Sequence, residues 1–225
     1  MSFISNMFKN LKKKKPQKIY YEDGDVYEGD FEDDLMQGKG KFIHATGGIY
    51  EGDFIRCKRT GKGKYTYVCG DVYEGDFVNA IYHGKGKYTY ANGDIYEGEY
   101  LRGKRTGKGK ITISDSGVYP LNIYDGEFNF KDTFDFVYGY TYEGDFLNDN
   151  IHGRGTCINP DGSTYIGDFF ENKIIGTGKL IHENGDIYEG EFIDGKYHGT
   201  GTLKSADGKI LQTGKWENGE FYDKK

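Results

Sequence analysis

The 225-residue chain has little proline (3), cysteine (3) or tryptophan (1), and it has no long apolar run. So little proline excludes a collagen-like chain or a proline-rich linker. Three cysteines, none of them in C-x-x-C spacing, exclude a disulfide framework and favour a reducing compartment. No stretch reaches the ~20 apolar residues of a transmembrane helix, and the N-terminus lacks a secretory apolar region. These absences favour a cytoplasmic protein.

Glycine and aromatic residues are abundant instead, with 36 glycines, 21 tyrosines and 15 phenylalanines. An aromatic content of 16% is too high for a disordered polar chain. A mean hydropathy of -0.77 leaves little aliphatic material for a thick core. The composition therefore predicts an all-β protein whose apolar surface is mostly aromatic.

Charge is unevenly distributed along the chain. Residues 1–18 carry six lysines and no acidic residue, whereas the other 207 residues hold 24 Lys and Arg against 36 Asp and Glu. An acidic body is a poor partner for the phosphates of nucleic acid or for an anionic membrane. We therefore expect no nucleic-acid binding, and we expect any attraction to polyanions to come from the N-terminal residues.

A repeat of 23 residues dominates the sequence. The motif Tyr-Glu-Gly-Asp/Glu-Phe/Tyr, or its variant Tyr-Ile-Gly-Asp-Phe, recurs in phase, and x-Gly-x-Gly follows ten residues after each tyrosine. The motif begins at Tyr27, Tyr50, Tyr73, Tyr96, Tyr142, Tyr165 and Tyr188.

One unit of the repeat is irregular. Tyr124-Asp125-Gly126-Glu127-Phe128 resembles the motif but is out of phase, and it has lost its x-Gly-x-Gly. We interpret residues 114–141 as a degenerate eighth repeat. Residues 212–222 then form a closing strand, so that residues 1–18 are a basic tail and residues 19–222 are the array.

Seven in-phase copies of Tyr-Glu-Gly-Asp-Phe, each with its Gly-x-Gly half, resemble the MORN (membrane occupation and recognition nexus) family over roughly residues 20–222. The resemblance implies tandem β-hairpins that form one elongated, single-layer antiparallel sheet. It also implies a targeting or assembly module at membranes and cytoskeletal structures. Some members carry lipid-kinase or lysine-methyltransferase domains, for which this chain shows no motif.

Strand alternation sorts each repeat into two faces. Tyr50, Gly52 and Phe54 share one face, and Glu51 and Asp53 share the other, where lysines of the next strand join them. The glycines leave gaps across which a neighbouring aromatic ring can lie. The expected aromatic face is Tyr50, Phe54, Tyr65, Tyr73, Phe77, Tyr88, Tyr96, Tyr100, Tyr142 and Phe146.

No arrangement of residues predicts catalysis, a metal or a cofactor. The Gly-x-Gly pairs recur with no helix after them, unlike a nucleotide-binding loop. Histidines exchange with Gln, Thr and Ile at the same repeat position, and eight nearly identical carboxylate pairs lie on a lysine-bearing face. We therefore expect no enzyme activity and a structural or solvent-facing role for all five histidines.

The tail has the pattern of an interfacial amphipathic helix with a polybasic patch. Apolar residues at helical spacing precede four lysines, and Pro16 would end a helix. The residues concerned are Phe3, Ile4, Met7, Phe8, Leu11, Lys12, Lys13, Lys14 and Lys15. Contact with an anionic membrane or phospholipid is the leading interpretation; docking on another protein and an unstructured leader stay open.

The irregular repeat is rich in aromatic residues and lacks glycine gaps. We expect it to kink the array, to fill a break between two sub-arrays, or to present an anchor for a partner. Its aromatic residues are Phe128, Phe130, Phe134, Phe136 and Tyr138.

The sequence thus predicts a non-catalytic scaffold, peripheral at a membrane or at membrane-linked cytoskeleton. Because a single sheet leaves its aromatic face uncovered, we expect a helix or peptide of a partner protein in an aromatic trough. Two alternatives stay open: a module accessory to a lipid kinase or methyltransferase in another chain, and a purely structural homodimer.

Overall fold

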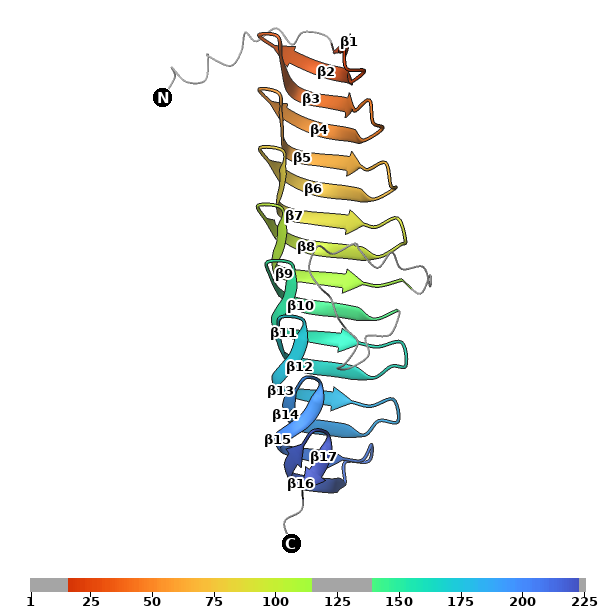
Figure 1. The fold of residues 1–225 in the computed structure, drawn as a ribbon, viewed down its shortest axis with the longest axis vertical. Coiled ribbons are helices and arrows are strands. Elements are labelled where there is room, and N and C mark those ends of the chain that lie inside the picture. The colour runs from red at the N-terminus through yellow and green to blue at the C-terminus, as the bar shows by residue number, and fades with distance from the viewer. Residues whose placement is uncertain (1–15, 115–138, 223–225) are drawn as a thin grey trace, which may run out of the picture. The chain divides into compact units, whose positions relative to one another are not determined.

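The computed structural model describes residues 16–114 and 139–222, and the regular elements in these ranges are β-strands (Figure 1). The same ranges contain no helix that is long and apolar enough to cross a membrane. The chain divides into two units, residues 1–84 and 85–225, and the division falls inside β7 (Ile81–Thr89). The predicted tail helix lies outside the described residues.

Both units are antiparallel meanders in which each strand pairs with the next. The first unit contains β1 (Gln17–Tyr20), β2 (Val26–Glu32), β3 (Leu35–Ile43), β4 (Ile49–Ile55), β5 (Lys58–Thr66) and β6 (Val72–Val78), paired in that order. The second contains β8 (Ile95–Leu101), β9 (Lys104–Thr112), β10 (Thr141–Leu147), β11 (Asn150–Ile158), β12 (Thr164–Phe170), β13 (Lys173–Ile181), β14 (Ile187–Ile193), β15 (Lys196–Lys204), β16 (Ile210–Glu217) and β17 (Glu220–Tyr222). The predicted all-β antiparallel fold is confirmed.

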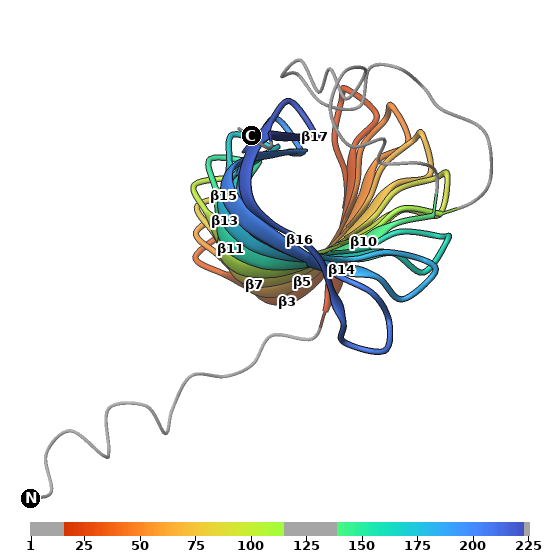
Figure 2. The same cartoon turned by 90° about the horizontal axis from the view of Figure 1, so that it is seen from below.

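Two kinds of connection alternate along each meander. A two-residue turn joins β4 to β5, and its residues Arg56 and Cys57 both have positive φ, 47° and 64°. Such turns match the right-handed twist of paired strands. A five-residue loop, 44–48, joins β3 to β4. All two-residue turns therefore lie at one edge of a unit, the turn edge, and the five-residue loops lie at the other, the loop edge (Figure 2).

The tyrosine that opens each repeat lies across a pair of glycines. Gly52 of β4 is directly opposite Gly63 of β5, and a Cβ added to Gly63 would lie 2.5 Å from a ring carbon of Tyr50. The Tyr50 hydroxyl then donates to the carbonyl oxygen of Asp53 at 3.0 Å. Equivalent tyrosine-to-carbonyl bonds are made by Tyr27, Tyr73, Tyr96, Tyr142, Tyr165 and Tyr188. The predicted fit of rings over glycine gaps is confirmed.

The tyrosine rings also make edge-to-face contacts with their own repeat and with the next repeat of the same unit. Tyr50 contacts Phe54 of its own strand and Phe77 of the next repeat, both at 5.1 Å between ring centroids. Contacts of this geometry contribute ~0.5–1.5 kcal/mol each beyond the area that they bury. We call this continuous series the aromatic ladder. In the second unit it runs through Tyr96, Tyr100, Phe146, Tyr142, Phe169, Tyr165, Phe192, Tyr188 and Trp216.

The strands on either side of the irregular segment pair directly with each other. Thr112 of β9 lies opposite Thr141 of β10, and Tyr96 contacts Phe146 at the usual 5.1 Å. The ladder therefore passes from the repeat at Tyr96 to the repeat at Tyr142 without an intervening strand. Residues 115–138, with the predicted eighth repeat and its aromatic residues from Phe128 to Tyr138, lie outside the described residues.

The second unit closes with β16 and β17, where residues 212–222 are predicted to form a closing strand. Trp216 occupies the ladder position that phenylalanine holds in other repeats, 5.3 Å from Tyr188. Its indole nitrogen donates to the carbonyl of Gly201 at 3.2 Å, and Phe221 covers its outer side at 5.1 Å. Trp216 is therefore buried although no further repeat follows it in the described residues.

We predict that Gly63→Ala lowers the free energy of unfolding by about 1–3 kcal/mol, because the new methyl group overlaps the Tyr50 ring. In a Tyr50→Leu background the same change should cost clearly less, since the ring is gone. Urea denaturation of the four chains of this double-mutant cycle measures the difference. An equal cost in both backgrounds would contradict the fit of ring to glycine.

Candidate binding surfaces

The aromatic face predicted to receive a partner is largely buried within the repeats themselves. Of the ten residues predicted for it, only Tyr65 and Tyr88 are half-exposed. The other eight are at most 6% exposed: Tyr50, Phe54, Tyr73, Phe77, Tyr96, Tyr100, Tyr142 and Phe146. For these eight the predicted open trough is wrong, because the hairpins of each unit curve (Figure 2) and because the ladder rings contact one another at about 5.1 Å.

Side chains from the second strand of a repeat also cover the ladder tyrosines. In the first unit Tyr82 stacks on Tyr73 with centroids 3.6 Å apart, and its hydroxyl is hydrogen-bonded to that of Tyr67. In the second unit Arg105 is 4% exposed and lies over Tyr96 at 5.3 Å. The sequence analysis did not identify these covering residues, because a Tyr or Arg in the second strand of a repeat can be either buried or exposed.

The ladder tyrosines are unsuited to acid–base chemistry. Burial, with help from the Asp53 carboxylate, raises the pKa of Tyr50 to about 12. Burial and the Glu191 carboxylate likewise raise the pKa of Tyr188 to about 12. Tyr96 and Tyr165 have pKa values raised by burial in the same direction. These hydroxyls stay protonated at neutral pH and act as donors to the backbone.

The aspartate of each motif holds a bulge in its own hairpin. Gly61 of β5 has φ +58°, and the Asp53 carboxylate accepts the amide of Lys62 at 3.1 Å. The Lys39 ammonium of the preceding repeat lies 2.7 Å from the same carboxylate. Equivalent amide bonds to the acidic residue of the motif are donated by Lys39, Lys108, Arg154, Thr177 and Thr200.

The glutamates of the motif pair with lysines on the outer face, as expected for the charged face. Lys41 contacts Glu51 at 2.5 Å, and Glu189 accepts Lys204 at 3.0 Å and Lys179 at 3.3 Å. These two ammonium groups hold the pKa of Glu189 below its usual value. The carboxylates of Glu51 and Glu189 are therefore occupied by ion pairs rather than poised for catalysis.

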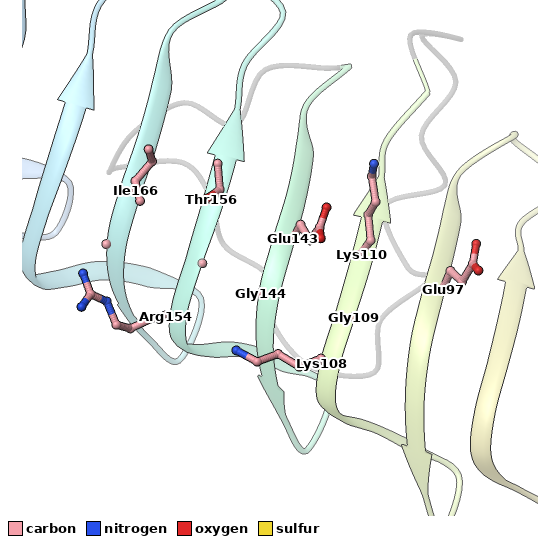
Figure 3. A pocket seen from close by; sticks show the side chains of 11 residues that line it. Glu97, Lys108, Gly109, Lys110, Glu143, Gly144, Arg154, Thr156 and Ile166 are labelled. Carbon is pink, nitrogen blue, oxygen red and sulfur yellow. The ribbon is translucent and has the colours of Figure 1, made fainter.

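A shallow cleft of about 780 Å³ lies on this charged face of the second unit. Its floor is glycine backbone, and Glu97, Lys110 and Glu143 project side by side from neighbouring strands rather than toward a common point (Figure 3). Thr156 lies opposite Ile166, so the series of charged pairs is interrupted there. The cleft assembles no catalytic group.

A second cleft of about 800 Å³ lies near the C-terminal end of the second unit. His182 Nε2 is hydrogen-bonded to the hydroxyl of Tyr197, whose ring stacks on Tyr188 at 3.6 Å. Ser163 donates to the Asp161 carboxylate at 2.7 Å and not to a histidine. This arrangement supplies no activated nucleophile.

The cysteines occupy three unrelated positions. Cys57 is exposed at the turn edge, Cys69 is exposed in a loop, and Cys157 is buried in β11, which raises the pKa of its thiol to about 12. Across residues 16–114 and 139–222, no three His, Cys, Asp or Glu side chains gather in a way that could hold a metal ion.

The exposed apolar side chains recur at the turn edge instead. The residue five positions after the repeat tyrosine, just beyond the motif, is apolar in six repeats and lies on the outer face. It is 46–54% exposed at Ile55, Val78, Leu101, Leu147, Phe170 and Ile193. The sequence interpretation missed this position because it followed the motif only as far as its fifth residue.

Comparison with known families agrees with the geometry. The MORN repeat family matches residues 27–49, 50–72, 73–95, 96–118, 142–164, 165–187 and 188–210. The chain belongs to the MORN repeat family. The seven matched MORN repeats coincide with the seven tyrosine-over-glycine units, and no match covers residues 119–141.

Curated proteins provide no match to this MORN chain. Among solved structures, it is similar to the TCP domain of SAS-4 (dCPAP) from Drosophila melanogaster, solved with a proline-rich motif of Ana2 (dSTIL). That similarity has 14% identity, 89% coverage of this chain, 90% coverage of the other and a TM-score of 0.44. The wild-type TCP10 domain of Danio rerio CPAP shows 11% identity, 90% coverage of both chains and a TM-score of 0.30. Nothing about partners follows from similarities this distant.

We predict that the stability of the MORN ladder falls steeply in alkali. Tyrosine in the unfolded chain ionises near pH 10, whereas Tyr50 does so near 12. Stability is therefore unaffected below pH 10 and is lost as the pH rises from 10 through 12, by at most about 1.4 kcal/mol per pH unit for each ladder tyrosine.

Urea midpoints measured between pH ~8 and ~11 test this, because unfolding would release additional tyrosine protons. Tyr50→Phe removes one such group. Its unfolding should release up to one proton fewer, so its stability should fall less steeply with pH. A midpoint that is the same at both ends of the range would show that the ladder tyrosines are not shielded.

Proposed function

We propose that this chain is a non-catalytic MORN scaffold that binds a partner protein on the outer surface of its repeats. We further propose that residues 1–15 hold it at an anionic membrane. The observation that carries the proposal is the division of apolar side chains between the two faces. The aromatic residues of the motif are buried in the ladder, whereas one outer position presents apolar side chains repeat after repeat. Regular exposure of this kind is typical of an interaction surface.

The absence of catalysis in this proposal is supported by the occupation of the polar groups. Motif aspartates such as Asp53 bind backbone amides, motif glutamates such as Glu51 and Glu189 bind lysines, and the ladder hydroxyls bind carbonyls. The two clefts described above bring no nucleophile and base together. A scaffold needs only a rigid surface, which the ladder and the charged pairs supply.

The role of residues 1–15 is argued from their sequence. The apolar side of the predicted helix includes Phe8 and Leu11, and Lys12–Lys15 follow it. Near an anionic surface each lysine contributes about 1 kcal/mol, and burial of the apolar side adds a few more. The total corresponds to binding in the micromolar range. The excess of acid in the rest of the chain opposes membrane contact by the repeats, so the tail would be the anchor.

We predict that the full chain sediments with vesicles containing phosphatidylserine and not with neutral phosphatidylcholine vesicles. Changing Lys13, Lys14 and Lys15 to Glu should abolish sedimentation. The control changes the exposed Lys110, Lys209 and Lys215 to Glu, which alters net charge equally and should leave most of the binding. Full sedimentation of the tail variant would refute the anchor.

The same tail variant separates the two halves of the proposal. Partners that copurify with both the original chain and the tail variant are held by the repeats. If every partner is lost with the three lysines, the repeats are not the binding surface and the scaffold assignment fails.

A further inference from the structure

The outer position at the turn edge forms part of a regular row in the second unit. Each apolar residue lies directly opposite a residue of the next strand, and the pairs are Leu101–Lys104, Leu147–Asn150, Phe170–Lys173 and Ile193–Lys196. Neighbouring strands are ~4.8 Å apart, so an apolar side chain recurs on every second strand with a polar partner beside it on the strand between. We call these eight residues the outer row. On its other flank Phe170 lies beside His152, with ring centroids 5.1 Å apart.

The free charge along the outer row is mainly positive. Lys173 is ion-paired with Asp194 at 3.2 Å, and Asp149 is engaged by Arg105. Lys104 and Lys196 form no ion pair with any described residue. The row therefore offers apolar side chains to a partner, and the ammonium groups of Lys104 and Lys196 can form ion pairs with its acidic residues.

The spacing of the outer row matches an α-helix. Its apolar residues recur about every 9.6 Å, twice the strand spacing. Along a helix, residues seven apart are ~10.5 Å apart, and residues three or four apart are ~4.5–6 Å apart. An extended peptide repeats its side chains on one face every ~6.6–6.8 Å, which does not fit.

We propose that the outer row is a docking site for an amphipathic α-helix of a partner protein. The contacting side of the helix carries an apolar residue every seventh position and acidic residues between them, opposite Lys104 and Lys196, which form no ion pair within the described ranges. This inference rests on the proposed scaffold function and specifies the surface and the chemistry of the partner.

A bilayer is a poorer occupant than a helix. Two residues along each strand from the row, the outer face carries the acidic residues of the motif, Glu99, Asp145, Asp168 and Glu191. A broad anionic surface that covered the row would also meet these carboxylates, whereas a helix ~10 Å wide can lie beside them. The apolar strip is only one residue wide, which suits a helix.

The test titrates the full chain into a labelled synthetic helix of about 22 residues, three heptads, with leucine at every seventh position and glutamate between. A second peptide has lysine in place of each glutamate. We expect saturable binding of the glutamate peptide and at least tenfold weaker binding of the lysine peptide. No saturable binding, or equal binding of both peptides, would overturn the proposal.

Two variants locate the site. Leu147→Ser with Phe170→Ser should weaken the glutamate peptide at least tenfold, while Ile210→Ser with Leu211→Ser, exposed residues outside the row, should not. Changing Lys104 and Lys196 to Glu should reverse the preference toward the lysine peptide. This reversal requires a folded chain, so it separates lost contact from lost structure.

Light scattering and vesicle sedimentation of the same variants give the remaining outcomes. If Leu147→Ser with Phe170→Ser converts a dimer to a monomer, a second copy occupies the row and the helix proposal fails. If that variant loses vesicle binding, a membrane occupies it. If the glutamate peptide fails to bind while tail-dependent sedimentation persists, the outer row is refuted and the proposed anchor stands.

Discussion

The fold depends on an aromatic ring that lies across two facing glycines. Gly52 and Gly63 stand opposite each other, and the Tyr50 ring fills the space that two side chains would occupy. The hydroxyl beyond the ring then reaches a backbone carbonyl of the same strand. One residue thus bridges both strands of a hairpin and presents its edge or face to the rings of the next repeat. Because every repeat needs its neighbour to complete this contact, the array is cooperative between adjacent repeats.

The acidic residues of the motif stabilise the same hairpin from its charged face. Asp53 satisfies the amide of the bulge at Gly61–Lys62 and binds the lysine of the preceding repeat. The ring and the carboxylate therefore set the bend of the hairpin together, one on each face. The conspicuous residues of the motif therefore make contacts within the protein, and the exposed apolar residues lie outside the motif.

The proposed function rests on that division of roles. The motif aromatic residues are buried in the ladder, so we propose the exposed apolar positions at the turn edge as the surface for a partner. Their pairing with polar residues, lysine or asparagine, reflects the hairpin itself, since residues flanking a two-residue turn lie directly opposite each other. The repeat thus presents a regular series of exposed apolar side chains, on which the proposed docking of a partner depends.

The sequence by itself determined the period, the strands, the faces and the fit of Tyr50 over its glycines, because these depend on contacts within one repeat and its neighbour. It also showed that the histidines and carboxylates are interchangeable or repeated, which argued against catalysis. Only the tertiary structure decided that Tyr50 and Phe54 are closed to a partner and that Leu147 and Phe170 are open. Alternation assigns a residue to a face, whereas burial depends on the curvature of the hairpins and on side chains such as Arg105 that fold over the ladder from elsewhere in the repeat.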